Sequence, residues 1–348
     1  MELPVIAITM GDPASIGPEL TAKTLCEERF YNECKPIVIG DVFCMTKALK
    51  AIRHEGINLN PISDVSKAVF RHGNIDILEM SSIQEGEIVP GQISKICGEA
   101  SFRYVEEAIK LALSNEAHAT VTNAICKEAI NLAGHAYAGH TEIFAALTGT
   151  TKYTMMLAHE NLRVVHVSTH VPLRQACELV TRGRVLEVIK LADRACKSLG
   201  IHEPRIAVAG LNPHSGEAGL FGTEEIEEII PAIEQACKDG MDAIGPVPPD
   251  TIFPKARGGW YDIVVAMYHD QGHIPLKMEG FVYDKEKKAW DAVAGVNISL
   301  GLPIVRTSVD HGTAMDQAYK GTASAISLTN AIEYAIKMAR AKIMLGEA

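Results

Sequence analysis

Short apolar runs alternate along the chain with longer stretches in which apolar residues follow a helical period. The apolar run PVIAIT at residues 4–9 precedes an amphipathic stretch at 18–30, and the same order recurs at 36–40 and 43–56. Repeated β and α segments of this kind build sheets covered by helices, so the pattern predicts an α/β fold with a largely parallel sheet.

Later segments continue the pattern. Further strands are expected at residues 119–124, 163–169, 205–211, 262–268 and 303–308. Further helices are expected at residues 99–116, 184–200, 223–240 and 322–345. The segment FVYDKEKKAWDAVAG at residues 281–295 has a charged centre between two aromatic residues and predicts an exposed hairpin or flap. A solvated loop insertion is the favoured interpretation of it, and a functional lid is the alternative.

Three histidines follow apolar runs in polar, turn-rich segments: His170, His214 and His269. Parallel strands deliver their C-terminal ends to one edge of a sheet, where sites form. Three imidazoles converging there could bind a divalent metal and leave a position open for substrate. Because the chain has 13 histidines, three unrelated surface or core histidines are an equally open interpretation of the pattern alone.

A fourth histidine, His273, lies four residues after His269 in the segment HDQGH. On a helix this spacing would resemble a two-ligand metal face. Gly272 and Pro275 argue against a regular helix, however, so His269 is assigned to the metal and His273 to a supporting or cofactor-side role.

Several polar residues are candidates for binding an anion. His140 and Thr141 stand at a predicted helix start, where free backbone N–H groups favour phosphate or carboxylate. Lys277 and Arg306 offer positive charge, and Asn297 is expected in a turn. Each alone has an ordinary explanation as a helix cap, a surface cation or a turn residue, so only their combination points to a site.

The opening segment TMGDPASIGPE is a strand, a turn and a helix, but it lacks both the GxGxxG and the P-loop pattern. A better nucleotide candidate is DHGTAMDQAYKG at residues 310–321, which resembles the HGxAxDxAxxG loop of isopropylmalate and isocitrate dehydrogenases. There His311 would contact adenine and Asp316 a ribose hydroxyl, with Gly312 and Thr313 between them. A plain turn before a helix is the alternative.

Composition and charge narrow the class of protein. The chain has 348 residues, 47% of them hydrophobic, which is enough for two domains or one large α/β unit. A net charge of -10 without a basic tract argues against nucleic acid as the partner. Eight scattered cysteines without a CxxC pair predict free thiols, and no signal peptide or membrane span is visible. A soluble cytoplasmic protein is therefore expected.

With these residues assembled, the chain resembles the 4-hydroxythreonine-4-phosphate dehydrogenase family over essentially its whole length. The resemblance is carried by TMGDPASIGPE, GHTE, STHVPLR, LNPHSGEAGLFGTEE, GPVPPDT, MYHDQGHIPLK and GVNISLGLPIVRTSVDHGTAMD. EAGLFG and MYHDQGHIPLK resemble most closely the branch of 4-phospho-D-threonate and 4-phospho-D-erythronate dehydrogenases.

The resemblance implies a two-domain α/β/α fold like that of isocitrate and isopropylmalate dehydrogenases. We expect one domain at residues 1–133 with 317–348 and a second at 134–316 that carries most metal and substrate residues. The resemblance also implies a homodimer whose active site lies in the cleft and at the dimer interface. It implies that the metal ligands are His170, His214 and His269, and that the substrate contacts are His140, Thr141, Lys277, Asn297 and Arg306.

The chain departs from the family pattern at three places. Ser15 stands where the family has Gly, and Ala124 and Cys126 stand where it has Pro and Asn or His. These two departures leave the choice of substrate open, because the loop with Lys127 could line the pocket. The insertion at 281–295 separates Lys277 from Asn297 by more than is usual, which indicates a changed lid or dimer edge.

The expected reaction oxidises the 3-hydroxyl of a 4-phosphorylated four-carbon acid, and decarboxylation of the β-keto acid gives dihydroxyacetone phosphate. NAD would accept the hydride, with NADP as an alternative, and a divalent ion would polarise the oxygen. Imidazole ligands favour Zn, Co, Mn or Ni over Mg. The candidate catalytic groups are Asp250, Asp270 and Lys277, and the general base stays open.

Two rival interpretations remain. If the substrate carries an amine beside its hydroxyl, the product is 3-amino-2-oxopropyl phosphate and the enzyme serves pyridoxal 5'-phosphate synthesis instead of carbohydrate metabolism. The other rival is a non-catalytic α/β protein that binds a phosphorylated ligand. Bound divalent metal and a response to NAD would separate an enzyme from such a binding module.

Overall fold

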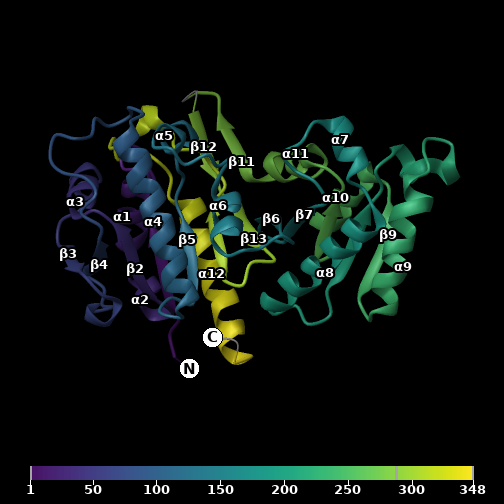
Figure 1. Ribbon diagram of the computed structural model, residues 1–348, viewed down its shortest axis with the longest axis horizontal. Helices are drawn as coiled ribbons and strands as arrows, with labels where there is room; N and C mark the ends of the chain where they lie inside the picture. The colour runs from purple at the N-terminus through teal and green to yellow at the C-terminus, as the bar shows by residue number, and fades with distance from the viewer. Residues whose placement is uncertain (1, 287–288, 347–348) are drawn as a thin grey trace. The chain divides into compact units, whose positions relative to one another are not determined.

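The computed structural model describes residues 2–286 and 289–346. It divides into two compact units, Met1–Thr151 with Leu302–Ala348 and Lys152–Gly301. The first unit is discontinuous, and the divisions fall after residues 151 and 301, whereas the sequence analysis placed the domain boundaries after 133 and 316. The reason is that residues 134–151 contain the helix His140–Leu147, which packs on the first unit, and residues 306–309 form a strand of its sheet. Figure 1 shows the elements of both units.

The strands of the first unit run in the order β3-β4-β2-β1-β5-β14, and each neighbouring pair is parallel. Their bounds are β1 (Val5–Thr9), β2 (Lys35–Gly40), β3 (Asn58–Ile62), β4 (Asn74–Glu79), β5 (Ala119–Thr122) and β14 (Arg306–Val309). All residues of β1, β5 and β14 are buried, as expected for strands covered on both faces. The predicted α/β class with a largely parallel sheet is confirmed.

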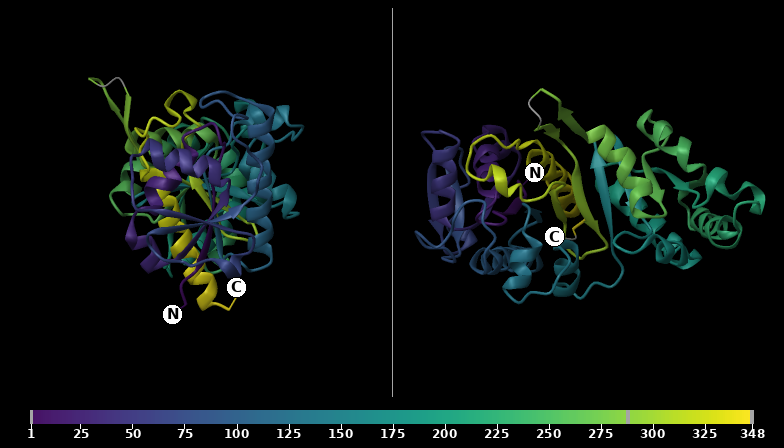
Figure 2. Two further views of the ribbon diagram at one scale, coloured as in Figure 1. Left: turned by 90° about the vertical axis from the view of Figure 1, so that its left-hand side faces the viewer. Right: turned by 90° about the horizontal axis from the view of Figure 1, so that it is seen from above.

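Helices cover both faces of this sheet, as the left view of Figure 2 shows. The helix α4 contacts β1, β2 and β5, whereas α12 contacts β14, β5 and β1. The helices of the unit are α1 (Gly17–Leu25), α2 (Glu28–Glu33), α3 (Val42–Ala51), α4 (Lys95–Leu113), α5 (Lys127–Leu132), α6 (His140–Leu147) and α12 (Ile326–Met344). Two short 3-10 turns are η1 (Val65–Lys67) and η4 (Met315–Gln317).

The second unit has the strand order β13-β6-β7-β10-β8-β9. The strands from β7 to β9 are parallel, whereas β6 pairs antiparallel with both β7 and β13. The bounds are β6 (Thr154–His159), β7 (Leu162–His166), β8 (Arg205–Ala209), β9 (Asp242–Val247), β10 (Ile263–Ala266) and β13 (Val296–Leu300). The core of the unit includes Val164, Ala207, Ile252 and Val264, all of them fully buried.

In this unit α8 and α9 pack together, α8 and α10 both contact β7, β8 and β10, and α11 contacts β6, β7 and β10. The helices are α7 (Leu173–Glu178), α8 (Arg182–Ser198), α9 (Ile230–Lys238), α10 (Pro249–Arg257) and α11 (His269–Gly280). The turn η2 (Pro213–Gly219) and the π-helical turn η3 (Glu225–Ile229) precede α9. No helix among the described residues is long and apolar enough to span a membrane.

The insertion at residues 281–295 forms a hairpin, as predicted. Its strands β11 (Phe281–Asp284) and β12 (Ala289–Val293) pair antiparallel, with a bulge between Val282 and Tyr283. The tip at residues 287–288 lies outside the described residues. The expected exposure of this segment therefore stays a prediction for the tip.

The prediction that Gly272 and Pro275 prevent a helix is wrong, because α11 contains both residues. Tertiary packing explains the difference. A Cβ on Gly272 would lie 2.4 Å from Nε2 of His166 and 2.6 Å from Cγ1 of Val164, so glycine allows α11 to pack closely on β7. Packing of this kind outweighs the low helix propensity of the two residues.

A glycine at a helix contact supplies a stability prediction. A Cβ on Gly98 of α4 would lie 2.0 Å from the backbone oxygen of Ala129 in α5. We expect Gly98→Ala to lower the free energy of unfolding by about 1–3 kcal/mol through overpacking. Urea denaturation measures the change.

Gly183 of α8 provides the matched control, because nothing lies within 4 Å of a Cβ placed there. We expect Gly183→Ala to raise the free energy of unfolding by about 0.4–1 kcal/mol, since alanine restricts the unfolded chain. Equal effects of the two substitutions would contradict the close contact between α4 and α5.

Candidate active site

The three predicted metal ligands follow three adjacent parallel strands of the second unit. His170 follows β7, His269 follows β10 and His214 follows β8. The strand β10 lies between the other two and pairs parallel with both. The C-terminal ends of these strands therefore point to the same edge of the sheet, which is the placement inferred from the apolar runs.

Two of the three rings face a shared region. The ring centroids of His170 and His269 lie 5.9 Å apart. With a metal–nitrogen distance of about 2.1 Å, two imidazoles on one ion place their centroids roughly 5–6 Å apart. Nδ1 of His269 lies 2.6 Å from Oδ1 of Asp270, which leaves Nε2 for a metal. A carboxylate in this position can orient a ligating imidazole, so His170 and His269 have the chemistry of two metal ligands.

His214 sits in a turn of unusual backbone conformation. Residues 214–218 all have positive φ angles, between 43° and 80°. Within residues 2–286 and 289–346, no three His, Cys, Asp or Glu side chains are placed so as to hold a metal ion. The structure thus brings His170 and His269 together, and places His214 only at the end of the adjacent strand.

His273 supports the site from within α11. Its ring stacks on that of His269 with centroids 3.6 Å apart, and its Nδ1 lies 2.9 Å from the backbone oxygen of His269. Burial lowers the pKa of His273 to about 4, so the ring is neutral at physiological pH. Gln271 links the strand ends, because its Oε1 accepts the N–H of Met267 and its Nε2 donates to the Gly210 oxygen.

The residues of the first unit that were predicted to bind an anion, His140, Thr141 and Arg306, lie together and are called the anion-binding group below. The helix α6 begins at His140, as predicted, with Thr141 in its first turn. Arg306 is 2% exposed, its Nη2 donates to Oγ1 of Thr122 at 2.7 Å, and its guanidinium lies 5.5 Å from the ring centre of Phe144. Burial lowers the pKa of Arg306 to about 9, so the side chain is still a cation at neutral pH.

His140 belongs to the same group. Its Nε2 is buried without a hydrogen-bond partner among the described residues. Burial, and then the charges of Arg306 and Lys127, hold the pKa of His140 well below its usual range. A neutral imidazole beside two cations is suited to donating a hydrogen bond to an anionic ligand. Lys127 is close enough to His140 for its charge to lower the pKa of that ring. The sequence analysis named Lys127 only as part of a loop that could line the pocket.

The other two predicted substrate residues lie in the second unit. Lys277 is in α11, with its Nζ 5.1 Å from the ring centre of Phe281. Asn297 was expected in a turn, and this prediction is wrong, because it lies in β13 opposite Leu157 of β6. The strand is short and flanked by glycines, and its three buried apolar residues, Val296, Ile298 and Leu300, alternate with polar ones instead of forming a continuous apolar run.

A buried carboxylate in the first turn of α1 binds the end of the predicted nucleotide loop. Glu19 accepts the N–H groups of Gly321 and Ala323 at 3.1 and 3.0 Å. Nε2 of His311 is buried without a partner among the described residues, and burial lowers the pKa of this ring. Asp316 is exposed, and its Oδ2 accepts a hydrogen bond from Gln317. The sequence offered no signal for the role of Glu19 beyond an acid in a first helical turn.

The remaining candidates have simpler surroundings. Asp250 is exposed in the first turn of α10, and the structure joins it to none of the predicted ligands. Ser15 has a local structural role, since its Oγ donates to the oxygen of Asp12 and accepts the N–H of Gly17. Cys126 is the residue before α5, which begins at Lys127.

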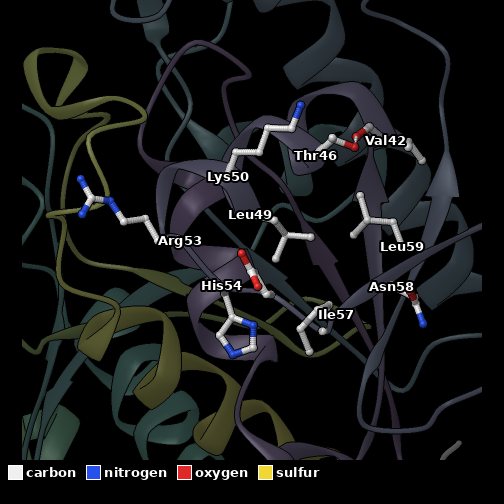
Figure 3. Close-up of a pocket in the computed structure, with 11 residues that line it drawn as sticks. Val42, Thr46, Leu49, Lys50, Arg53, His54, Ile57, Asn58 and Leu59 are labelled. Carbon is white, nitrogen blue, oxygen red and sulfur yellow. Dashed lines mark hydrogen bonds between the residues drawn. The ribbon is translucent and has the colours of Figure 1, made fainter.

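A hollow of about 840 Å³ lies elsewhere in the first unit, along α3 and the turn into β3 (Figure 3). Leu49, Ile57 and Leu59 give it an apolar lining, and Lys50 and Arg53 stand at its rim. It contains none of the predicted site residues. The strand-end histidines of the second unit and the predicted anion-binding residues of the first unit, and not this hollow, are therefore the candidate functional groups.

Comparisons with known proteins place the chain among the dehydrogenases, as predicted. It belongs to the PdxA family, since the model "Pyridoxal phosphate biosynthetic protein PdxA" matches residues 32–335. The D-threonate 4-phosphate dehydrogenase of Salmonella typhimurium is 46% identical over 343 residues, covering 97% of this chain and 100% of that protein. The enzyme of the same name from Pectobacterium atrosepticum is 44% identical, covering 96% and 99%.

A solved structure agrees with this assignment. The 4-hydroxythreonine-4-phosphate dehydrogenase of Klebsiella pneumoniae is 42% identical, covers 97% of this chain and 98% of its own, and has a TM-score of 0.85. The family resemblance inferred from the motifs is therefore confirmed over nearly the whole chain.

Proposed function

We propose that the protein is a metal- and NAD-dependent dehydrogenase that oxidises the 3-hydroxyl of 4-phospho-D-threonate or 4-phospho-D-erythronate. Loss of carbon dioxide from the resulting β-keto acid would give dihydroxyacetone phosphate. The observation that carries the proposal is the full-length similarity to enzymes named D-threonate 4-phosphate dehydrogenase, together with the histidines at three adjacent strand ends.

The anion-binding group supports a phosphorylated acid as substrate. Arg306 can form charge-assisted hydrogen bonds with phosphate or carboxylate, and His140 and Thr141 stand at the start of α6, where backbone N–H groups favour an anion. Lys277 and Asn297 are the proposed contacts from the second unit. Burial of Arg306 strengthens its interaction with an anion, because water screens the charge less.

The metal ligands in this proposal are His170, His214 and His269. When bound, a divalent ion such as Zn, Co, Mn or Ni would polarise the substrate oxygen as a Lewis acid. Asp270 orients His269 through its contact with Nδ1. Asp250, Asp270 and Lys277 remain the proposed groups for proton transfer, with Asp270 better suited to orientation because it already contacts His269.

The nucleotide would bind the loop that contains His311, Gly312, Thr313 and Asp316. The buried Nε2 of His311 offers an unused hydrogen-bonding group for adenine. The exposed carboxylate of Asp316 suits a ribose hydroxyl and disfavours the extra phosphate of NADP. Hydride would pass from the substrate carbon to the nicotinamide while a protein base takes the hydroxyl proton.

A homodimer is part of the proposal. Apolar side chains near the strand-end histidines are exposed in the single chain, among them Ile274 at 57%, Met278 at 80%, Leu220 at 72% and Phe221 at 47%. Exposed apolar groups around a site mark a surface that a partner covers. We propose a cytosolic location as well, which agrees with the free state of all eight cysteines, every one within the described residues.

Formation of NADH tests the substrate assignment. Purified protein with a divalent metal is given 4-phospho-D-threonate, 4-phospho-D-erythronate or 4-phosphooxy-L-threonine, each with and without a chelator. We expect a hydroxy acid to be the preferred substrate and the chelator to stop the reaction.

Two other outcomes would replace the proposal. Preference for the amino acid would favour pyridoxal phosphate synthesis, which the family description and the name of the Klebsiella pneumoniae structure already suggest for those relatives. A protein that binds a phosphorylated ligand but neither metal nor NAD would be a binding module.

A further inference from the structure

The turn that carries His214 is held in a conformation that its residues would not adopt unaided. His214, Ser215, Glu217 and Ala218 have left-handed φ and ψ angles, with Gly216 between them. For each L-residue other than glycine this conformation is disfavoured, because Cβ comes too close to the following carbonyl oxygen. Such a run persists only where the surrounding structure enforces it, so the turn needs a specific partner.

Glu225 is that partner. Its carboxylate is buried, with the residue 1% exposed, and its Oε1 accepts the N–H groups of Leu211 and Asn212, each at 2.8 Å. Its Oε2 accepts a hydrogen bond from Nδ2 of Asn212 at 2.9 Å. Three N–H donors offset the cost of burying the charge. The carboxylate therefore fixes the two residues that lead into the turn.

The far side of the turn packs on the same carboxylate. A Cβ on Gly216 would lie only 2.7 Å from Oε2 of Glu225, and the φ of Gly216 is +80°. Glu225 also begins the π-helical turn η3, a feature that occurs often at functional sites. The turn is thus held on both sides of His214 by one side chain.

We propose that Glu225 is a positioning residue that fixes the turn carrying His214 and thereby sets the affinity of this histidine for the metal. The inference rests on the proposed function, in which His214 is a metal ligand. The neighbouring Gly210 is tied to α11 by Gln271, so the fixed turn keeps a defined position relative to His269.

The test compares Glu225→Gln with Glu227→Gln, an exposed acid in the same π-helical turn that loses the same charge. Three properties are measured: hydrogen exchange of residues 210–219 without metal, the dissociation constant and visible absorption spectrum of bound Co²⁺, and the thermal midpoint. We expect Glu225→Gln to speed exchange in this segment, change the spectrum and weaken Co²⁺ binding by about 10–100-fold. Glu227→Gln should match the wild type in all three.

Asn212→Ala keeps the proposal testable if Glu225→Gln does not fold, because it removes the side-chain amide, which donates to Glu224 as well as to Glu225, but keeps both backbone donors to Glu225 and should shift the same properties less. Unchanged exchange and unchanged Co²⁺ affinity in a folded Glu225→Gln protein would overturn the proposal. If the wild type binds no Co²⁺, the metal role of His214 fails with the proposed function. Exchange of residues 210–219 still decides in that case whether Glu225 holds the turn.

Discussion

Replacing His214 with alanine is expected to remove bound metal and lower turnover by more than about a hundredfold, beyond the 10–100-fold effect of losing an outer partner of a metal ligand. The fold should persist, since alanine meets the same left-handed backbone cost that histidine already bears at φ 51°. Metal content by atomic absorption, kcat and the thermal midpoint are the measurements.

His202→Ala is the matched control, because His202 is exposed and precedes the N-terminal end of β8, whereas His214 follows the C-terminal end of the same strand. It should retain metal and full activity. Retention of metal and activity by His214→Ala would remove His214 from the proposed ligand set and leave His170 and His269 in need of another third ligand.

The apolar pattern found most strands of the sheet interior, but it missed the interior strands β4 and β6 as well as β3, β9 and β13 at the ends of the strand orders. β1, β5 and β10 are buried at every position, so their continuous apolar runs stand out. β3 and β9 end the strand orders of their units, and most of their residues are exposed or half-buried. Edge strands need few apolar residues, so a search for apolar runs passes over them.

The placement of the candidate residues was predictable where they follow strand ends and unpredictable where tertiary contacts determine it. His170, His214 and His269 could be grouped because parallel strands bring their C-terminal ends together. Glu19 and Glu225 could not be found, since each acts through backbone N–H groups of a distant loop. The helix α11 was missed for a related reason, because packing against His166 and Val164 determines its conformation.

The two buried glutamates, Glu19 and Glu225, make the same kind of contact with a loop of the candidate site. Glu19 holds the loop proposed for the nucleotide, and Glu225 holds the turn proposed for the metal. In each case a carboxylate inside the fold accepts N–H groups of an irregular segment, which would otherwise leave those donors buried and unsatisfied. The functional loops are thus fixed by the scaffold before any ligand binds.

Arg306→Ala is expected to raise the KM for the phosphorylated acid by about 10–150-fold, the equivalent of one charged hydrogen bond at roughly 1.5–3 kcal/mol. The kcat should fall less, because the guanidinium would bind a group that does not react, so ground state and transition state lose the interaction together. Arg306→Lys should give an intermediate KM, since lysine keeps the charge but not the planar fork.

The pKa of Arg306, lowered to about 9 by burial, adds a pH dependence to this prediction. The guanidinium is charged below that value and loses its proton as pH rises through it, so kcat/KM of the wild type should fall above about pH 9. Arg306→Ala should lack this decline. Arg340→Ala, which removes a partly buried arginine bonded to the Glu33 oxygen, is the control and should leave KM unchanged. An unchanged KM in a folded Arg306→Ala protein would exclude Arg306 from substrate binding.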